Sequence, residues 1–413
     1  MINGDTGVVI IGGGAAGVAA ARRLHQGGID CLILEARSRL GGRGWTIRDA
    51  SGHALDLGCG WLHSADRNPW ATVAETHGRT IDKTPPPWMR PALQPGFPLA
   101  EQQQFRAAME EVYDRLGEGV RGEHDEDDAA ALGAGGRWNG LIDAVGTYIS
   151  GAELDHVSAR DFDNYKDTGV NWRVAEGYGA TIAAHGEGLA VMLDCPVRRI
   201  DHSGARLRIE TAKGDIAADQ AIVTLPTTII ARNEELFAPK LPDKTQAACN
   251  LPLGLADKMF MTLEDAEAFE PESRLFGKTD RSATATYHLR PFGRPMIEAY
   301  FGGSHAWTLE AEGERAFFDF AVSELTALLG SAFAKRVKPL NMHRWGADPF
   351  AGGSYSYALP GKTGCRAVLA APVDDCLFFA GEACSKGDFS TAHGGWFTGI
   401  AAAEQVIAAR ARR

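Results

Sequence analysis

Short apolar runs alternate with glycine turns and helical patterns from the beginning of the chain. Residues 7–11 (GVVII) are an uninterrupted apolar run, which predicts a short buried strand. The glycine-rich residues 12–17 predict a turn, and residues 15–26 follow as a helix. The run DCLILEA at 30–36 predicts a second strand. The first 36 residues therefore predict a strand–turn–helix–strand unit.

The rest of the chain mixes strand and helix patterns. Residues 179–186 predict a helix, alternation in ARLRIET before a turn at AKGD predicts a hairpin, and QAIVTLP predicts a buried strand. Residues 251–340 carry both kinds of signal. Near the C-terminus, CLFFAGEA predicts a strand that ends in a glycine turn, and residues 394–413 predict a helix. We expect an α/β fold.

A proline-rich segment interrupts these patterns at 84–100. Its three consecutive prolines cannot continue a helix or a central strand, so we expect the chain to cross between domains there. The acidic patch GEHDEDDAAA at 122–131 is interpreted as a solvated surface turn.

Composition narrows the class of protein. The chain has 413 residues and a formal net charge of -11, which argues against a nucleic-acid surface. Its seven cysteines form no CxxC pair, and no cluster of ligands has metal spacing, so we expect neither a disulfide framework nor a metal. Neither a signal peptide nor a long apolar span is evident. We therefore expect a soluble cytoplasmic protein.

The glycine turn has the spacing of a nucleotide-binding loop. Gly12, Gly14 and Gly17 form G-x-G-x-x-G between the first strand and the first helix, and Glu35 ends the next strand. Glycines at these positions let a pyrophosphate approach the helix N-terminus. Glu35 can accept both ribose hydroxyls of an adenosine and would repel a 2′-phosphate. This pattern predicts a dinucleotide site that disfavours NADP.

The run EARSRLGGRGWT resembles the second signature of FAD-dependent oxidoreductases. In this run Gly41 and Gly42 admit close backbone contact, and Arg43 can clamp a phosphate. The later runs DLGCGWLHS, LADKMFM, RWGADPFAGGSYSYALPG and LFFAGEACSKGDFSTAHGGWFTGI extend the likeness over nearly the whole chain. Together they resemble the flavin amine oxidase family, which includes polyamine oxidases, monoamine oxidases and lysine-specific histone demethylases.

The resemblance implies a doubly wound, Rossmann-like FAD-binding domain with an inserted α+β substrate domain. The FAD-binding domain would comprise 1–83, 173–250 and 341–413, and the substrate domain 84–172 and 251–340. The implied FAD contacts come from Gly12, Gly14, Ala15, Ala16, Gly17, Glu35, Ala36, Arg37, Gly42, Arg43, Gly58, Gly60, Trp61, Val197, Trp345, Gly381, Glu382, Thr391 and Ala392.

Lys258 is the expected catalytic residue. It stands in the apolar run LPLGLADKMFM, where a lysine must either reach water or serve a site. The family segment that resembles this run carries a lysine that hydrogen-bonds a water beside flavin N5. The resemblance implies that role for Lys258, with a lowered pKa, in substrate deprotonation or in the reaction with oxygen.

Further positions follow from the same resemblance. Animal monoamine oxidases bind flavin covalently through a cysteine, and Ser354 stands at the matching position, so we expect non-covalent FAD. Tyr355 and Trp396 would be the two walls of an aromatic cage for the amine. His63 and Trp61 match the polyamine oxidase run that ends in W-I-H-G and would line the substrate pocket.

Two features bear on the substrate. L-amino-acid oxidases hold the substrate carboxylate with an arginine near His63, and no arginine stands in the matching stretch, which disfavours an amino acid. Asp161, Asp163 and Asp167 are candidates to bind a distal ammonium, although surface carboxylates are the simpler interpretation.

The expected reaction is oxidation of an amine to an imine, which water hydrolyses, with O2 reduced to H2O2. The alternatives are a desaturase or oxidase acting on C–C bonds, an L-amino-acid oxidase, and a non-catalytic FAD scaffold. The expected partners are a small-molecule amine and O2, in a homodimer, with no nucleic acid and no membrane.

Overall fold

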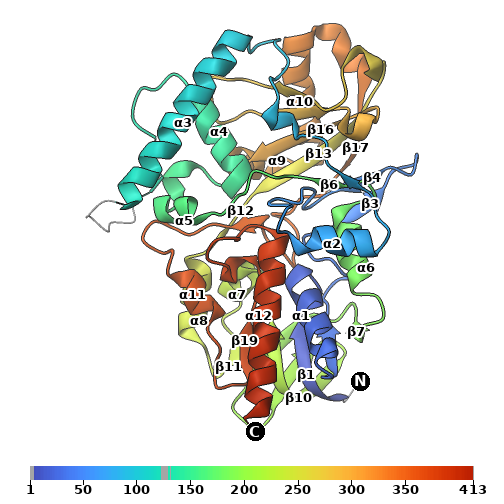
Figure 1. Cartoon of the computed structure of the whole chain (residues 1–413), viewed down its shortest axis with the longest axis vertical. Coiled ribbons are helices and arrows are strands. Elements are labelled where there is room, and N and C mark those ends of the chain that lie inside the picture. The colour runs from blue at the N-terminus through green and yellow to red at the C-terminus, as the bar shows by residue number, and fades with distance from the viewer. Residues whose placement is uncertain (1–3, 122–128, 131, 413) are drawn as a thin grey trace.

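A sheet of mainly parallel strands forms one end of the molecule (Figure 1). The computed structural model describes residues 4–121, 129–130 and 132–412, so the acidic stretch 122–128 lies outside it. The strands run in the order β11-β8-β9-β10-β1-β2-β7, and β19 also pairs with β10. Strands β2, β1, β10 and β19 are parallel. Their bounds are β1 (Gly4–Ile11), β2 (Cys31–Leu34), β7 (Val191–Met192), β8 (Val197–Asp201), β9 (Leu207–Thr211), β10 (Gly214–Val223), β11 (Phe237–Ala238) and β19 (Leu377–Phe379).

Helices from opposite ends of the sequence cover this sheet together. Helix α1 (Ala15–Gln26) packs beside α12 (Ala392–Ala411), which Figure 1 draws in blue and red. The two helices approach closely because Gly399 has no side chain: a Cβ there would lie 2.2 Å from the carbonyl oxygen of Ala16. The N-terminal and C-terminal segments thereby belong to one folded unit.

An antiparallel sheet forms the other end. Its order is β14-β15-β16-β13-β17, with bounds β13 (Ala256–Leu263), β14 (Ser273–Phe276), β15 (Thr286–Leu289), β16 (Met296–Gly302) and β17 (Val337–Met342). One face is apolar and packs against α9 (Gly303–Glu312) and α10 (Glu314–Leu329). Helices α3 (Leu99–Arg121), α4 (Asn139–Ser150) and α5 (Ala159–Asn164) complete this end.

The remaining elements are short, and the helices at 227–232, 242–249 and 365–370 pack against the mainly parallel sheet. These short elements are β3 (Thr46–Arg48), β4 (Ala54–Asp56), α2 (Pro69–Thr76), β5 (Ile81–Asp82), β6 (Arg173–Val174), α6 (Tyr178–His185), α7 (Thr227–Arg232), α8 (Pro242–Cys249), β12 (Leu253–Gly254), β18 (Tyr355–Ser356) and α11 (Cys365–Ala370). Strands β5 and β6 pair antiparallel on either side of the 84–172 segment. The four boundaries between the five predicted domain segments remain a prediction.

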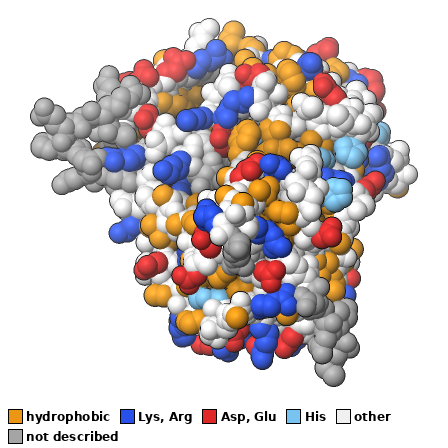
Figure 2. All heavy atoms as spheres, turned by 60° about the horizontal axis from the view of Figure 1, so that its bottom comes forward, with side chains coloured by type: hydrophobic (Ala, Val, Ile, Leu, Met, Phe, Trp, Pro, Cys, Tyr) orange, Lys and Arg blue, Asp and Glu red, His pale blue; other side chains and the backbone are white. Residues whose placement is uncertain are grey.

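The predicted local elements agree with the structure. Helix α1 has the predicted bounds, the predicted hairpin is β9–β10, and the C-terminal helix begins at Ala392 rather than at residue 394. The α/β fold class is confirmed. Within the described ranges, no helix is long and apolar enough to cross a membrane. On the face shown in Figure 2, basic and acidic side chains are interspersed, as on an ordinary solvated surface.

Candidate functional site

A cavity of about 1000 Å³ runs from the glycine turn after β1 to the antiparallel sheet. Nearly all the residues that the sequence indicated line it, although they are spread over the whole chain. They are Gly12, Gly14, Ala15, Ala16, Glu35, Ala36, Arg37, Gly42, Arg43, Gly58, Gly60, Trp61, His63, Val197, Lys258, Trp345, Ser354, Tyr355, Gly381, Glu382, Thr391 and Ala392. The fold therefore brings both halves of the predicted site into one cavity.

The N-terminus of α1 offers a cradle for a phosphate. Gly14 is its N-cap and makes no side-chain cap hydrogen bond, and Ala15 and Ala16 line the cavity. A Cβ placed on Gly14 would meet only Gly42 Cα at 3.7 Å and Gly41 O at 4.0 Å. The space above this turn is thus open to a ligand, and the helix end favours a negative charge there.

Gly17 has a different role from the one predicted. It does not line the cavity, and a Cβ there would lie 1.9 Å from the carbonyl oxygen of Gly12. The absence of a side chain lets the helix begin directly against the turn. Gly17 therefore shapes the cradle without facing the cavity.

Substitutions of Gly14 and Gly17 give a matched test of the cradle. We expect Gly14→Ala to weaken FAD binding at least tenfold, because its methyl group would enter the open space, while changing the unfolding free energy of the apoprotein by only about 1 kcal/mol. Gly17→Ala should destabilise the apoprotein itself. FAD titration and denaturant unfolding of both variants measure this. Unchanged FAD affinity in Gly14→Ala would place the cofactor elsewhere.

Glu35 is fixed at the edge of the cradle. Its Oε2 accepts from the Gly13 amide at 2.7 Å and its Oε1 from the Arg37 amide at 2.8 Å. The side chain of Arg37 pairs with Asp348 at 2.6 Å. Because each carboxylate oxygen can accept a second hydrogen bond, Glu35 keeps the capacity to bind ribose hydroxyls.

Arg43 and Glu382 form an ion pair across the cavity wall. Arg43 Nη1 donates to Glu382 Oε1 at 2.9 Å and to the Ser354 carbonyl at 2.8 Å. Ser356 Oγ donates to the other oxygen of Glu382 at 2.6 Å. Burial raises the pKa of Glu382, but Arg43 and Ser356 outweigh it and hold the pKa below its usual value. The pair is a fixed polar wall, and the remaining Arg43 donors can meet a phosphate.

Lys258 is buried and held at two points. Its Nζ donates to the Asp56 carbonyl at 2.8 Å and lies 3.3 Å from Glu298 Oε1. An ammonium has three N–H groups, so one is left for the cavity. The expectation of a lowered pKa is wrong: burial lowers the pKa, but Glu298 and Asp56 outweigh it and raise it above the usual value. Lys258 is therefore charged at neutral pH.

A cluster of three tyrosines lies on the cavity wall, with one of them next to Lys258. Tyr300 lies opposite Lys258 in the β13–β16 ladder, and its hydroxyl is 3.2 Å from that of Tyr355. Tyr148 stacks edge-on against Tyr300 with ring centroids 5.6 Å apart. On another wall, the rings of Trp61 and Trp88 lie 4.5 Å apart. This end of the cavity is an aromatic chamber.

Trp396 is not a wall of this chamber. It is absent from the residues that line the cavity and packs against Trp70 at 4.8 Å and His185 at 5.2 Å. Its neighbour Gly395 faces the cavity, and successive residues on a helix point in different directions. Tyr300 takes the place beside Tyr355 that the sequence analysis gave to Trp396.

The other predicted pocket residues divide into two groups. His63 lines the cavity, with Nδ1 2.6 Å from Asn171 Oδ1, and burial lowers its pKa. Asp161 is buried and paired with Arg366, so it is not available to a substrate ammonium. Asp163 is absent from the cavity lining, whereas Asp167 is exposed and lines it.

Sequence reasoning missed Glu298, Tyr300 and Arg274. The signal for the first two was strand alternation in MIEAYFG, where Ile297, Ala299 and Phe301 are buried in the core. Only the pairing of four strands shows that these three missed residues share the cavity face with Lys258.

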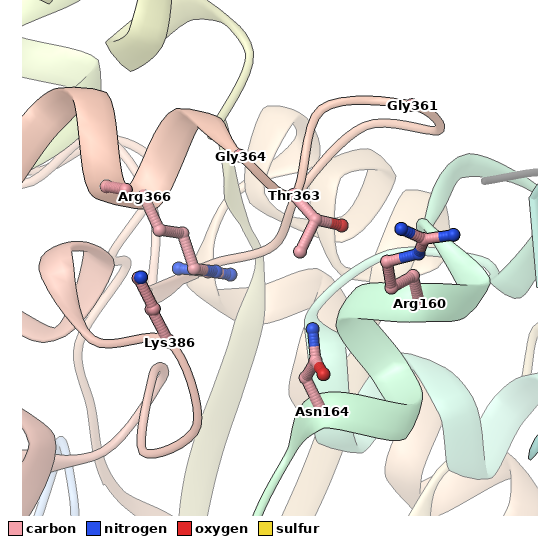
Figure 3. A pocket seen from close by; sticks show the side chains of 8 residues that line it. Arg160, Asn164, Gly361, Thr363, Gly364, Arg366 and Lys386 are labelled. Carbon is pink, nitrogen blue, oxygen red and sulfur yellow. The ribbon is translucent and has the colours of Figure 1, made fainter. Parts of the chain in front are cut away.

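A second cavity, of about 440 Å³, lies between α5 and α11. Figure 3 shows Arg366 extending from α11, with Arg160 and Asn164 on the α5 wall opposite. Arg366 is committed to Asp161, so this smaller cavity adds no chemistry to the larger one. Among the described residues, no group of three or more His, Cys, Asp or Glu side chains could hold a metal ion.

Comparisons with known proteins find a matching family and several similar proteins. The model of the family "Flavin containing amine oxidoreductase" matches residues 15–79 and 99–407. Polyamine oxidase 4 of Oryza sativa subsp. japonica is 30% identical, covering 96% of this chain and 88% of its own. Human lysine-specific histone demethylase 2 is 25% identical over 97% of this chain and 53% of its own. A putrescine oxidase variant has the same fold, with a TM-score of 0.77 and 17% identity over 98% of this chain and all of its own.

Proposed function

The chain belongs to the family of flavin-containing amine oxidoreductases and is an FAD-dependent amine oxidase, and from this premise we infer that it converts a primary or secondary amine to an imine. When bound, FAD would supply the redox chemistry: it would accept a hydride from the α-carbon of the neutral amine at flavin N5, and O2 would take the electrons as H2O2. Water hydrolyses the imine to an aldehyde or ketone plus ammonia or an amine. We also propose that O2 is the electron acceptor, that the protein is a homodimer and that it is cytoplasmic.

The observation that carries the proposal is the fixed ammonium of Lys258, which lines the same cavity as the cradle and the aromatic chamber. With its pKa raised, Lys258 is a poor base for a substrate ammonium. Its free N–H instead orients a water or stabilises negative charge that develops in the cavity. Lys258 therefore acts as a hydrogen-bond donor and a charge.

The aromatic walls orient the amine and limit water. Tyr300 and Tyr355 fix each other through their hydroxyls, and Tyr355 also donates to the Tyr148 carbonyl. Rings held in this way present flat apolar faces to an alkyl or aryl amine and also attract its cationic form on entry. The chamber thus favours a neutral amine next to the reacting position.

We propose that FAD is bound without a covalent link. Ser354 Oγ donates to the Ala256 carbonyl at 2.8 Å and accepts from the Ala256 amide at 2.9 Å, so its hydroxyl is occupied by the backbone. A hydroxyl here forms no thioether. Acid precipitation of the holoenzyme should release all the flavin into the supernatant, and flavin retained in the pellet would contradict the proposal.

The decisive experiment is anaerobic mixing of the holoenzyme with single amines, followed at the oxidised flavin band at about 450 nm. Loss of this band with an amine, and H2O2 on admitting air, would support the proposal. Reduction by dithionite but by no amine would oppose it and favour a scaffold role.

The pH dependence tests the assignment of Lys258. We expect kcat/KM to rise with pH as the substrate amine loses its proton, with the same midpoint in the wild type and in Lys258→Met. Lys258 is not expected to supply this rise, because Glu298 and Asp56 outweigh the effect of burial and hold its pKa above the usual lysine value. Steady-state profiles with one amine measure it. If kcat/KM did not rise with pH in Lys258→Met, Lys258 would be the base that deprotonates the substrate.

A further inference from the structure

Three arginines that the proposed reaction does not use line the cavity. Arg274 on β14 lines the cavity. Arg90, in the segment before α3, and Arg106, on α3, line it as well. Among the described residues, no carboxylate lies within 4.0 Å of any of these three guanidinium groups. The protein as a whole is acidic, with 53 Asp and Glu against 42 Lys and Arg, so this local excess of positive charge runs against the average.

The carboxylates of the cavity do not offset this charge. Glu298 is paired with Lys258, Asp161 with Arg366, and Glu382 with Arg43. Glu35 lies at the opposite end, beside the α1 cradle. Asp167 is exposed, on the segment after α5, and contributes to the electrostatic environment of His63.

The sheet register fixes where Arg274 stands relative to Lys258. Lys258 pairs with Tyr300, Tyr300 with Thr286, and Thr286 with Phe276, which gives one row across four strands. Arg274 pairs with His288, and His288 with Glu298, in the adjoining row on the same face. Arg274 is therefore three strands from Lys258, roughly 14 Å along the sheet. This distance separates it from the reacting end of the cavity.

Arg274 is held in place but is not neutralised. Its Nε donates to Thr286 Oγ1 at 2.9 Å, its guanidinium lies 4.1 Å from the centroid of Phe276, and its own carbonyl accepts from the Leu93 amide at 2.7 Å. Within the described part of the chain, its two terminal nitrogens make no hydrogen bond. Burial lowers its pKa to about 10, which still leaves it charged at neutral pH. A planar fork of this kind suits a carboxylate.

We propose that the substrate is an amine that carries a carboxylate several bonds from the carbon that is oxidised, and that Arg274 binds this carboxylate. The proposal rests on the proposed amine oxidase function and adds the substrate class. A second ammonium at this end, as in a diamine, would face the guanidinium of Arg274 and be repelled. Arg90 and Arg106 also line the cavity, but they are exposed and solvent screens their charge, so Arg274 is the group that decides. The carboxylate instead gains a charge-assisted pair inside the cavity.

The test compares matched amines in anaerobic flavin reduction by the wild-type holoenzyme. The series are γ-aminobutyrate, δ-aminovalerate and ε-aminocaproate, each beside the alkylamine and the diamine with the same number of carbons. We expect at least one aminocarboxylate to exceed its alkylamine by about 10- to 100-fold in reduction rate over dissociation constant, and its diamine to be the slowest. If diamines are fastest in every set, or alkylamines equal aminocarboxylates, the proposal is overturned while amine oxidation stands.

Variants test whether Arg274 is the residue that binds the substrate carboxylate. Arg274→Gln should bring the aminocarboxylate-to-alkylamine ratio close to one, and Arg274→Lys should keep part of it, because an ammonium retains the charge without the fork. Arg115→Gln, on the exposed surface of α3 and outside the cavity lining, is the matched control and should keep the wild-type ratio. FAD content and circular dichroism report folding. An unchanged ratio in Arg274→Gln would overturn the assignment of Arg274, and failure of every amine to reduce the flavin would overturn the function itself.

Discussion

Lys258→Met is expected to lower aerobic turnover by about a hundredfold or more. The substitution removes a buried cavity donor that the Asp56 carbonyl and the Glu298 carboxylate hold in place. Lys258 provides an N–H donor and a positive charge, and it does not act as a base. The larger loss of rate should therefore fall on the reaction of the reduced flavin with O2. Stopped-flow reduction without oxygen and reoxidation with oxygen separate the two halves.

The same substitution also affects stability. It leaves Glu298 without its partner in a largely buried setting, which costs about 3–5 kcal/mol when such a pair is broken. Lys258→Met with Glu298→Gln should recover much of the unfolding free energy and none of the turnover. Glu298→Gln alone, which keeps the lysine, is the matched control. Turnover within about twofold of wild type in folded Lys258→Met would refute the assigned role.

Arg366→Met is expected to lower the free energy of unfolding by about 3–5 kcal/mol. Arg366 and Asp161 are 0% and 1% exposed and form two parallel hydrogen bonds of 2.8 and 2.7 Å. The pair joins α11 to α5. Removal of the cation leaves a buried carboxylate uncompensated, which is the costly case for an internal ion pair.

The loss should extend to FAD. Arg366 also donates to Ser356 Oγ at 3.0 Å, and Ser356 Oγ in turn donates to Glu382 in the cavity wall. We expect Arg366→Met to release FAD at lower denaturant than the wild type, measured by flavin fluorescence beside circular dichroism. Arg366→Met with Asp161→Leu should recover part of the stability.

A surface pair gives the matched control for this effect. Arg315 and Asp319 lie one helical turn apart on α10 and are exposed. Arg315→Met should leave the denaturation midpoint unchanged, because solvent screens such pairs. Equal effects of Arg315→Met and Arg366→Met would show that burial does not govern the contribution of Arg366.

Local sequence was sufficient for the elements whose signal is contained in one segment. The strand, turn and helix around Gly12 and Gly14 depend on an apolar run and on glycines within a few residues, so the helix bounds were predicted correctly. Lys258 stood out because a charge in a buried strand is anomalous wherever the strand packs. Family resemblance then gave these residues a role, and the cavity lining agrees for most of them.

The direction of side chains and their partners required the fold. Trp396 turns to Trp70 because the helix phase of α12 is set by its packing on α1, which no local pattern specifies. The raised pKa of Lys258 depends on Glu298, 40 positions away in the chain and opposite only through the β13–β16 pairing. Similarly, Asp161 was a candidate ligand by sequence and is committed to Arg366 in space.

By itself, the sequence determined the class of this protein: an α/β fold, a nucleotide cradle after the first strand, and an amine oxidase with flavin. Only the tertiary structure decided which charges are free. Ion pairs form between residues far apart in sequence, and desolvation depends on everything packed around them. For that reason Lys258 is paired with Glu298, whereas Arg274 keeps a guanidinium without a carboxylate partner at the far end of the cavity, where it bears on the choice of substrate.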